Sequence, residues 1–274
     1  MNYQLNTKKM GALAFTIFLF VACNKNAGAQ NPDQVSSADD DSATEELIIG
    51  GHAVTKKSEI AATTVSLLDV AQGTLCTASI LADDIAITAA HCVDGNPADM
   101  EISFGPKSAG HEVRPVEETI VSPAWSVHQN DEANSGDIAL VKFSGGLPPG
   151  ATPATLMKAS HRLSNGEIVT LAGFGISKGS GSGAGQLRTV DVKIAKAQFS
   201  KTEVSLDQHD HKGACHGDSG GPAFIQDNNG GLLLWGVTSR GIDDPTDHCV
   251  GESVYTRIQP YARWINSIVR KWHR

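Results

Sequence analysis

Ser219 lies in the stretch CHGDSGGP, where a reactive side chain is set among three glycines and a proline. A serine hydroxyl is a poor nucleophile at neutral pH unless a base takes its proton, and a third group must orient that base. The stretch TAAHC offers His91 at the end of an apolar run, and SGDIALVKF offers Asp137 directly before another. Taken singly, these residues fit a turn serine, a core histidine and a turn aspartate. Together they have the composition of a nucleophile, a base and an orienting acid.

The elements that must position these side chains read as strands. Short apolar runs rich in β-branched residues recur after Leu47, among them TTVSLL, DIALVKF, TVDVKIA and LLLWGVTS. Gly, Pro, Asn and Asp separate these runs, and this pattern of short strands and turns favours an antiparallel β-sandwich or barrel. The pair Asp83-Asp84 reads as a hairpin connection between two strands.

The C-terminus is predicted to form a helix. Tyr261, Trp264, Ile265, Ile268 and Val269 follow one another at offsets of 3, 4, 7 and 8 residues, which is the apolar stripe of an amphipathic helix. We expect this helix to pack on the strands, with its aromatic side chains serving as core contacts.

Composition limits the class of protein. The chain has 274 residues, of which 40% are hydrophobic and 19% charged, enough for one or two domains with a sizeable core. The formal net charge is −8, from 22 Lys and Arg against 30 Asp and Glu, and basic residues form no run. Nucleic acid is therefore excluded as an expected partner.

Residues 1–22 read as a targeting signal. Lys8 and Lys9 precede an apolar stretch, Met10–Ala22, which is too short for a spanning helix but suits a signal peptide. The stretch ends FVAC, which resembles the cleavage box of bacterial lipoproteins and makes Cys23 a candidate lipidation site and membrane anchor. The alternative is an ordinary secretory signal cut near the AGA that follows, with Cys23 discarded.

The sequence divides into three segments: the signal at 1–22, a polar and acidic tether or propeptide at 23–47, and a folded domain at 48–274. Five cysteines in an exported chain leave one without an intramolecular partner, and Cys23 is the one outside the folded domain. The others permit three pairings on sequence alone; they are Cys76, Cys92, Cys215 and Cys249.

Three stretches in one order carry a resemblance to a known family. TAAHC, GDIALV and GDSGGP follow one another as His, Asp and Ser in a β-rich domain, and the chain resembles the trypsin/chymotrypsin family of serine endopeptidases. The resemblance covers residues 48–274 and includes IIGG, LCTASIL and VYTRI. It implies an all-β fold of two six-stranded antiparallel β-barrels with a C-terminal α-helix and the active site between them.

The resemblance also implies roles. Ser219 would attack the peptide carbonyl, His91 would act as base and then as acid, and Asp137 would hold the imidazole. The backbone N–H groups of Gly217 and Ser219 would form the oxyanion hole. Asp218 would pair with a new N-terminal ammonium on Ile48 after cleavage of the Leu47-Ile48 bond.

The substrate pocket follows from the same resemblance. Its floor would be Gly213, six residues before the nucleophile, with Gly241, Ser239 and Ser253 around it. Trypsin-type enzymes carry an aspartate at the floor, so a glycine predicts cleavage after a neutral, medium or large apolar residue. Arg240 stands where the family usually has tryptophan, and an acidic substrate side chain is the alternative that this arginine leaves open.

The family pattern implies two disulfides, Cys76 with Cys92 and Cys215 with Cys249. The histidine-rich stretch DQHDHKGACH invites a zinc or copper site at His209, His211 and His216. We expect a solvated loop instead, with no metal and no cofactor. Protein or peptide substrates and a monomer are expected, either membrane-anchored through Cys23 or secreted after activation.

The sequence leaves two other classes of protein to compare with this one. A non-catalytic binding or adhesion protein on the same fold is the main alternative, because a fold does not guarantee chemistry. A serine esterase of the α/β-hydrolase type would share a G-x-S-x-G pattern with GDSGG, but it needs the order Ser, Asp, His and a strand-turn-helix around the serine. The order and the β-rich texture of this chain contradict it.

Overall fold

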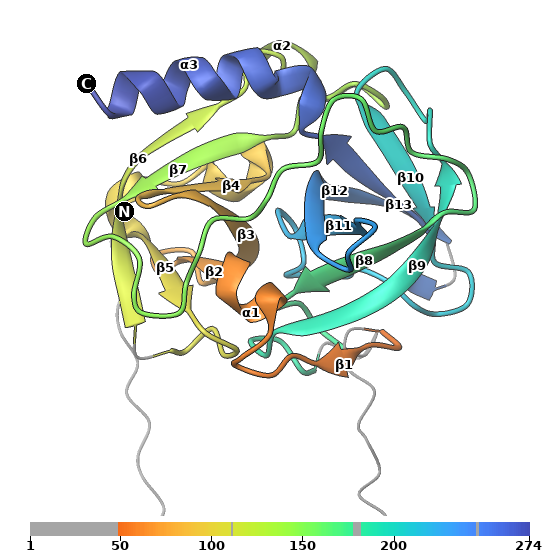
Figure 1. Ribbon diagram of the computed structural model, residues 1–274, viewed down its shortest axis with the longest axis horizontal. Coiled ribbons are helices and arrows are strands. Elements are labelled where there is room, and N and C mark those ends of the chain that lie inside the picture. Colours follow the sequence, from red (N-terminus) through yellow and green to blue (C-terminus); the bar gives the residue numbers. More distant parts are fainter. Residues whose placement is uncertain (1–48, 111, 178–181, 245–246) are drawn as a thin grey trace, which may run out of the picture. The chain divides into compact units, whose positions relative to one another are not determined.

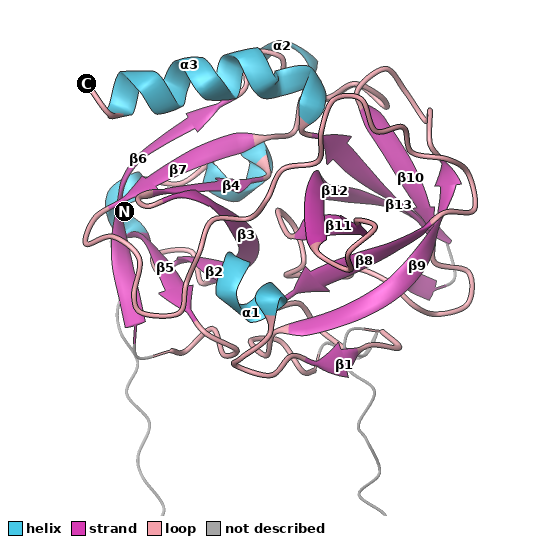
Figure 2. Ribbon diagram, in the orientation of Figure 1, coloured by secondary structure: helices cyan, strands magenta, loops and turns pink. Residues whose placement is uncertain are grey.

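A computed structural model describes residues 49–110, 112–177, 182–244 and 247–274. Strands dominate these residues, and helices are few and short apart from the one at the C-terminus (Figure 2). The predicted signal, the tether with Cys23, and Leu47 and Ile48 lie outside the described residues. No helix in the described ranges has both the length and the apolar character needed to cross a membrane.

Six strands of the N-terminal half close into an antiparallel barrel in the order β2-β3-β4-β7-β6-β5 (Figure 1). Asp83-Asp84 connects β3 to β4 as predicted, with Ala82 paired to Ile85 across the turn. The barrel interior is filled by branched aliphatic side chains and by Phe104 and Phe143, whose rings meet edge to face. The strands are β2 (Thr64–Asp69), β3 (Thr74–Ala82), β4 (Ile85–Thr88), β5 (Met100–Phe104), β6 (Glu112–Val121) and β7 (Ala139–Phe143).

Six strands of the C-terminal half form a second antiparallel barrel, in the order β9-β10-β13-β12-β11-β8, which the β8–β9 pairing closes. In β9 alternate residues are buried, as a strand with one face on a core requires. The short β1 (His52–Ala53) adds to the outer edge of β9. The barrel strands are β8 (Ile168–Gly173), β9 (Arg188–Lys196), β10 (Glu203–Asp207), β11 (Pro222–Gln226), β12 (Leu232–Asp244) and β13 (Asp247–Arg257).

The predicted two-barrel, all-β fold with a C-terminal helix is confirmed. The helix is α3 (Ala262–Trp272), and its Ile265 is buried while Trp264 and Ile268 pack beside it. That cluster also includes Leu140 of the first barrel and Leu234 of the second, so the two barrels share one core. The remaining helical segments are α1 (Glu59–Thr63), η1 (Ala90–Val93), η2 (Pro97–Asp99), α2 (Trp125–His128) and η3 (Gln259–Tyr261).

Candidate active site

Strand pairing brings His91 and Asp137 together. His91 lies in η1, just after β4 ends, and Asp137 lies just before β7 begins. Strands β4 and β7 are antiparallel, with Thr88 opposite Ala139, so the end of one strand meets the start of the other. His91 Nδ1 is 2.8 Å from Asp137 Oδ2, and the His91 backbone N–H donates to Oδ1 over 3.1 Å.

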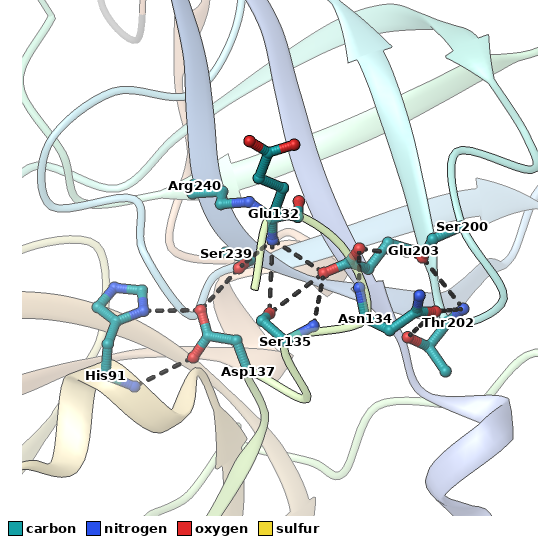
Figure 3. Close-up of polar contacts among 10 residues, drawn as sticks. All are labelled: His91, Glu132, Asn134, Ser135, Asp137, Ser200, Thr202, Glu203, Ser239 and Arg240. Carbon is teal, nitrogen blue, oxygen red and sulfur yellow. Dashed lines mark hydrogen bonds and ion pairs between the residues drawn. The ribbon is translucent and has the colours of Figure 1, made fainter. Parts of the chain in front are cut away.

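Asp137 is only 2% exposed, so its carboxylate depends on protein donors for its solvation. His91 supplies two of them, and the hydroxyl of Ser239 donates a third to Oδ2 over 2.7 Å (Figure 3). Because a carboxylate only accepts, this geometry places the His91 proton on Nδ1 and leaves Nε2 as an acceptor. Sequence reasoning placed Ser239 in the pocket wall and missed this contact.

The protonation of His91 reflects two opposing influences. Burial of the ring disfavours its charged form, but the hydrogen bond and charge of Asp137, with the charge of Asp94, outweigh burial and raise the pKa of His91 above its ordinary 6.5. The ring keeps 32% of its side-chain surface exposed. The ring is therefore accessible to a substrate from solvent, while its contact with the buried Asp137 fixes its orientation.

Ser219 is held between the two barrels by backbone contacts. Its carbonyl accepts from the N–H of Thr77 on β3 over 2.8 Å, and the next residue, Gly220, donates to Thr238 on β12 over 2.8 Å. A Cβ at Gly220 would collide with Thr88 Oγ1 and with the Thr77 carbonyl, and its φ is +79°. Only glycine allows the loop to approach so closely to the strand that leads to His91. Among the described residues Ser219 Oγ has no hydrogen-bond partner.

Gly217, in the same loop as Ser219, also needs to be glycine. Its φ is +95°, a Cβ there would lie 2.8 Å from Gly175 Cα, and its carbonyl accepts from Thr77 Oγ1 over 2.9 Å. The disulfide between Cys76 and Cys92 then joins the strand that holds this loop to the segment that carries His91. The structure thus brings His91 and Asp137 into contact and packs the loop that carries Ser219 against the strand that leads to His91.

Asp218 points inward and is 2% exposed. Its Oδ1 accepts from Gly175 N–H and its Oδ2 from Cys215 N–H, each over 2.8 Å. Burial raises the pKa of Asp218 to about 6, although both N–H donors and the charge of Arg188 act in the opposite direction. Its expected partner Ile48 lies outside the described residues.

Two glycines of the AGFG stretch make room for this carboxylate. A Cβ at Gly173 or Gly175 would collide with the side chain of Asp218. In the sequence this stretch belongs to the apolar run EIVTLAGFG, which indicates only a strand. The repeated glycine at i and i+2 directly after an apolar run was the available signal.

A cavity of about 230 Å³ opens beside Ser219. Gly213, which was predicted to form the floor, is not among the residues that line this cavity. A Cβ at Gly213 (φ +149°) would collide with the side chain of Gln208, which does line it. The Gln208 amide nitrogen donates to the carbonyls of Ala214 (3.1 Å) and Cys249 (3.0 Å), and its oxygen accepts from Ala214 N–H (2.9 Å). Gln208, which sequence reasoning missed, therefore fills the space that a side chain at position 213 would occupy. The predicted pocket residues Ser239, Gly241 and Ser253 line the same cavity.

Arg240 is not a free cation. Its guanidinium lies 2.8 Å from Glu203 Oε1 and donates to the carbonyl of Glu132 over 2.6 Å. Burial alone would raise the pKa of Glu203, but hydrogen bonds from Arg240, Asn134 N–H and Ser200, with the charge of Arg240, outweigh burial and lower it. A buried carboxylate therefore already holds the Arg240 guanidinium, which argues against the alternative that Arg240 attracts an acidic substrate side chain.

The cysteines pair as the resemblance implied, Cys76 with Cys92 and Cys215 with Cys249. In the described part of the chain, the groups at metal-binding distance are Cys76 with His91 and Cys92, and Cys215 with His216 and Cys249. In both groups the two sulfurs are bonded to each other and offer no thiolate. His209 pairs with Asp207 at 2.7 Å instead of joining either group.

Comparison with known proteins places this arrangement in a family. A family model described as Trypsin matches residues 48–265. Transmembrane protease serine 11G of Rattus norvegicus is 30% identical over 211 residues, which cover 70% of this chain and 49% of that protein. Brachyurin of Leptuca pugilator is 30% identical over 206 residues, covering 70% and 86%. Trypsin-1 of Astacus astacus is 29% identical over 211 residues, with the same two coverages.

The chain spans about half the length of the transmembrane protease that it matches. The family match, by contrast, covers most of this chain and both of its barrels. The chain therefore belongs to the trypsin family of serine endopeptidases.

Proposed function

We propose that this protein is a serine endopeptidase that hydrolyses protein or peptide substrates with Ser219, His91 and Asp137. The observation that carries the proposal is the fixed His91–Asp137 pair, whose 2.8 Å contact sets the ring tautomer. Nε2 of His91 is thereby an acceptor for the Ser219 proton. The hydrogen bond between them is absent from the described contacts, and such bonds tighten when a substrate is bound.

The reaction proceeds in two halves. Ser219 Oγ attacks the carbonyl carbon while its proton passes to His91 Nε2, and the carbonyl oxygen takes the negative charge. The N–H groups of Gly217 and Ser219 stabilise that charge. His91 then gives the proton to the leaving amine, and the acyl group stays on Ser219. Water attacks the acyl-enzyme with His91 again acting as base, which releases the acid and restores the serine.

Substrates are cleaved after a neutral residue, and the pocket chemistry supports this. Two side chains that are charged at neutral pH line the cavity, and each has a partner of opposite charge: Glu252 lies 2.9 Å from Lys196, and Arg240 lies 2.8 Å from Glu203. The floor is the carboxamide of Gln208, which carries no charge. A substrate cation would be desolvated there without a counter-charge of its own.

Activation is proposed to follow cleavage between Leu47 and Ile48. The Ile49 carbonyl accepts from Gly213 N–H over 3.1 Å, so the chain directly after the cleavage site runs beside Gly213. The ammonium of Ile48 would pair with Asp218, a buried carboxyl whose pKa is raised by burial. If Cys23 carries lipid, the same cut releases the enzyme from the membrane. The monomer and the exported location are parts of this proposal.

Hydrolysis of a casein substrate and of a peptide library by the chain cut at Leu47-Ile48 tests the proposal. We expect cleavage after neutral residues such as Leu, Phe or Tyr, and no cleavage by the Ser219→Ala variant. A protein that binds these substrates but leaves them intact would instead be the non-catalytic alternative. Rapid cleavage after Arg or Lys, with none after apolar residues, would refute the specificity alone.

A further inference from the structure

A buried ion pair lies behind Asp137. Glu203, the first residue of β10, has no exposed surface, and Arg240 follows Ser239 on β12. The Arg240 guanidinium approaches Glu203 Oε1 to 2.8 Å (Figure 3). Burying a carboxylate away from water costs free energy unless a cation and hydrogen-bond donors satisfy its oxygens. Apolar side chains of similar size would stabilise the fold equally well, so stability alone does not explain why an ion pair is present here.

The bonds of Glu203 converge on the loop that carries Asp137. Its Oε2 accepts from Asn134 N–H over 2.7 Å, and its Oε1 accepts from the hydroxyl of Ser135 over 3.2 Å. Arg240 donates to the carbonyl of Glu132 in the same loop over 2.6 Å. The ion pair therefore clamps residues 132–135, directly before Asp137, to two strands of the second barrel.

The same guanidinium reaches the hydroxyl that serves Asp137. Arg240 Nη1 lies 3.4 Å from Ser239 Oγ, and Ser239 Oγ donates to Asp137 Oδ2 over 2.7 Å. Arginine can only donate, so the hydroxyl accepts from Arg240 and turns its own proton toward Asp137. Figure 3 shows these contacts as one continuous chain from Glu203 to His91.

We propose that Arg240 and Glu203 are positioning residues for the reaction, which act through Ser239 and the 132–135 loop to hold Asp137 against His91. This inference rests on the proposed function of the site. Its physical basis is that small displacements of catalytic groups are costly: a misplacement of about 1 Å can lower the rate by roughly 100-fold.

Arg240 also lines the cavity beside Ser219, so a direct contact with substrate is the competing explanation. The two roles differ in their kinetics. A positioning role lowers kcat, whereas a direct contact that binds the substrate raises KM and leaves kcat unchanged. Separate measurement of kcat and KM on an ester of a single neutral amino acid therefore distinguishes the two roles.

The test compares Arg240→Met with the parent protein, both as the chain cut at Leu47-Ile48, on such an ester. We expect kcat to fall roughly 10- to 100-fold while KM stays within about twofold. Arg240→Lys keeps a positive charge beside Glu203 but lacks the second guanidinium nitrogen that donates to the Glu132 carbonyl. Its kcat should lie between those of Arg240→Met and the parent protein. Lys142→Met is the matched control: it removes a cation that pairs with Glu117 at 3.1 Å on the first barrel, and its kcat should be unchanged.

Arg240→Met leaves the Glu203 carboxylate buried without its partner and can prevent folding, so the double variant Glu203→Met/Arg240→Met removes both charges. It should fold and show the same loss of kcat. An unchanged kcat in either folded variant, or a rise in KM alone, would overturn the positioning role. Failure of the proposed function is a separate result, because the parent protein itself would then not hydrolyse the ester.

Discussion

Ser239 Oγ donates a 2.7 Å hydrogen bond to Asp137 Oδ2, the same oxygen that faces His91 Nδ1. One carboxylate oxygen of a buried side chain is thus held from the first barrel by the histidine and from the second barrel by the serine. The site lies across the contact of the two barrels because both contribute to fixing this one group.

Replacing Ser239 by alanine removes one of the three donors to Asp137. A hydrogen bond to a charged group is worth about 1.5–3 kcal/mol, so kcat/KM should fall roughly 10- to 100-fold. Steady-state hydrolysis of a neutral peptide amide measures it. Ser79→Ala is the matched control, because Ser79 is also buried but its hydroxyl has no partner in the described part of the chain. Equal activities of the two variants would contradict the assigned contact.

The activity should rise with pH as His91 loses its proton. His91 accepts the serine proton only when neutral, and its pKa lies above the ordinary 6.5. The midpoint of the acid limb of kcat/KM is therefore expected above pH 6.5. Mutation of Asp137 to asparagine removes the influence that raises this pKa, and the limb should shift to lower pH in the residual activity. A parent midpoint below 6.5 would contradict the assignment.

Asp218 predicts a pH effect on the stability of the uncut chain. Its carboxyl has a pKa of about 6 in the fold against an ordinary 3.8, so the folded state binds more protons than the unfolded state between these values. Stability should therefore fall as pH rises from about 4 to about 6, by at most about 3 kcal/mol for this group. Asp218→Asn does not titrate and should lack this component in denaturant unfolding at the two pH values.

The same variant separates stability from activity. After cleavage at Leu47-Ile48, Asp218→Asn cannot form an ion pair with the new ammonium, and the oxyanion loop should lose its order. Loss of one oxyanion donor typically lowers the rate by about 100- to 1,000-fold. A cut variant with parent activity would show that the Ile48–Asp218 pair is unnecessary.

Gln208 should control the size of residue that the pocket accepts. Gln208→Ala removes the carboxamide that fills the floor beside Gly213, so the kcat/KM ratio of Phe to Leu substrates should rise, by roughly tenfold. Gln226→Ala, on an exposed residue of β11, is the control and should keep the parent ratio. A ratio that is unchanged in Gln208→Ala would remove Gln208 from the specificity.

Much of this arrangement is predictable from local sequence. The strands follow from short β-branched runs, and His91 and Asp137 each lie beside one of them, so their meeting requires only that β4 and β7 pair. The helix α3 follows from its apolar period. In each case the signal lies within the residues that form the element.

The parts that sequence reasoning missed depend on contacts between distant segments. Glu203 and Arg240 are 37 residues apart in the sequence. They meet because β13 pairs with both of their strands, β10 and β12, and so places the two strands in one sheet. Gly175 and Asp218 are 43 residues apart. Gln208 reaches the pocket floor through the turn before Gly213, in a stretch that reads as a solvated histidine-rich loop. A short motif cannot show such contacts, because the partner is set by barrel register.

The central claim is that Ser219 is a nucleophile activated by His91, and covalent labelling tests it most directly. The chain cut at Leu47-Ile48 is treated with a fluorophosphonate, and the modified residue is located by mass spectrometry. We predict one phosphonate per chain on the peptide that contains Ser219, no label in Ser219→Ala, and greatly slowed labelling in His91→Ala. Absence of label in the parent protein, or labelling of Ser219 at the parent rate in His91→Ala, would contradict the account.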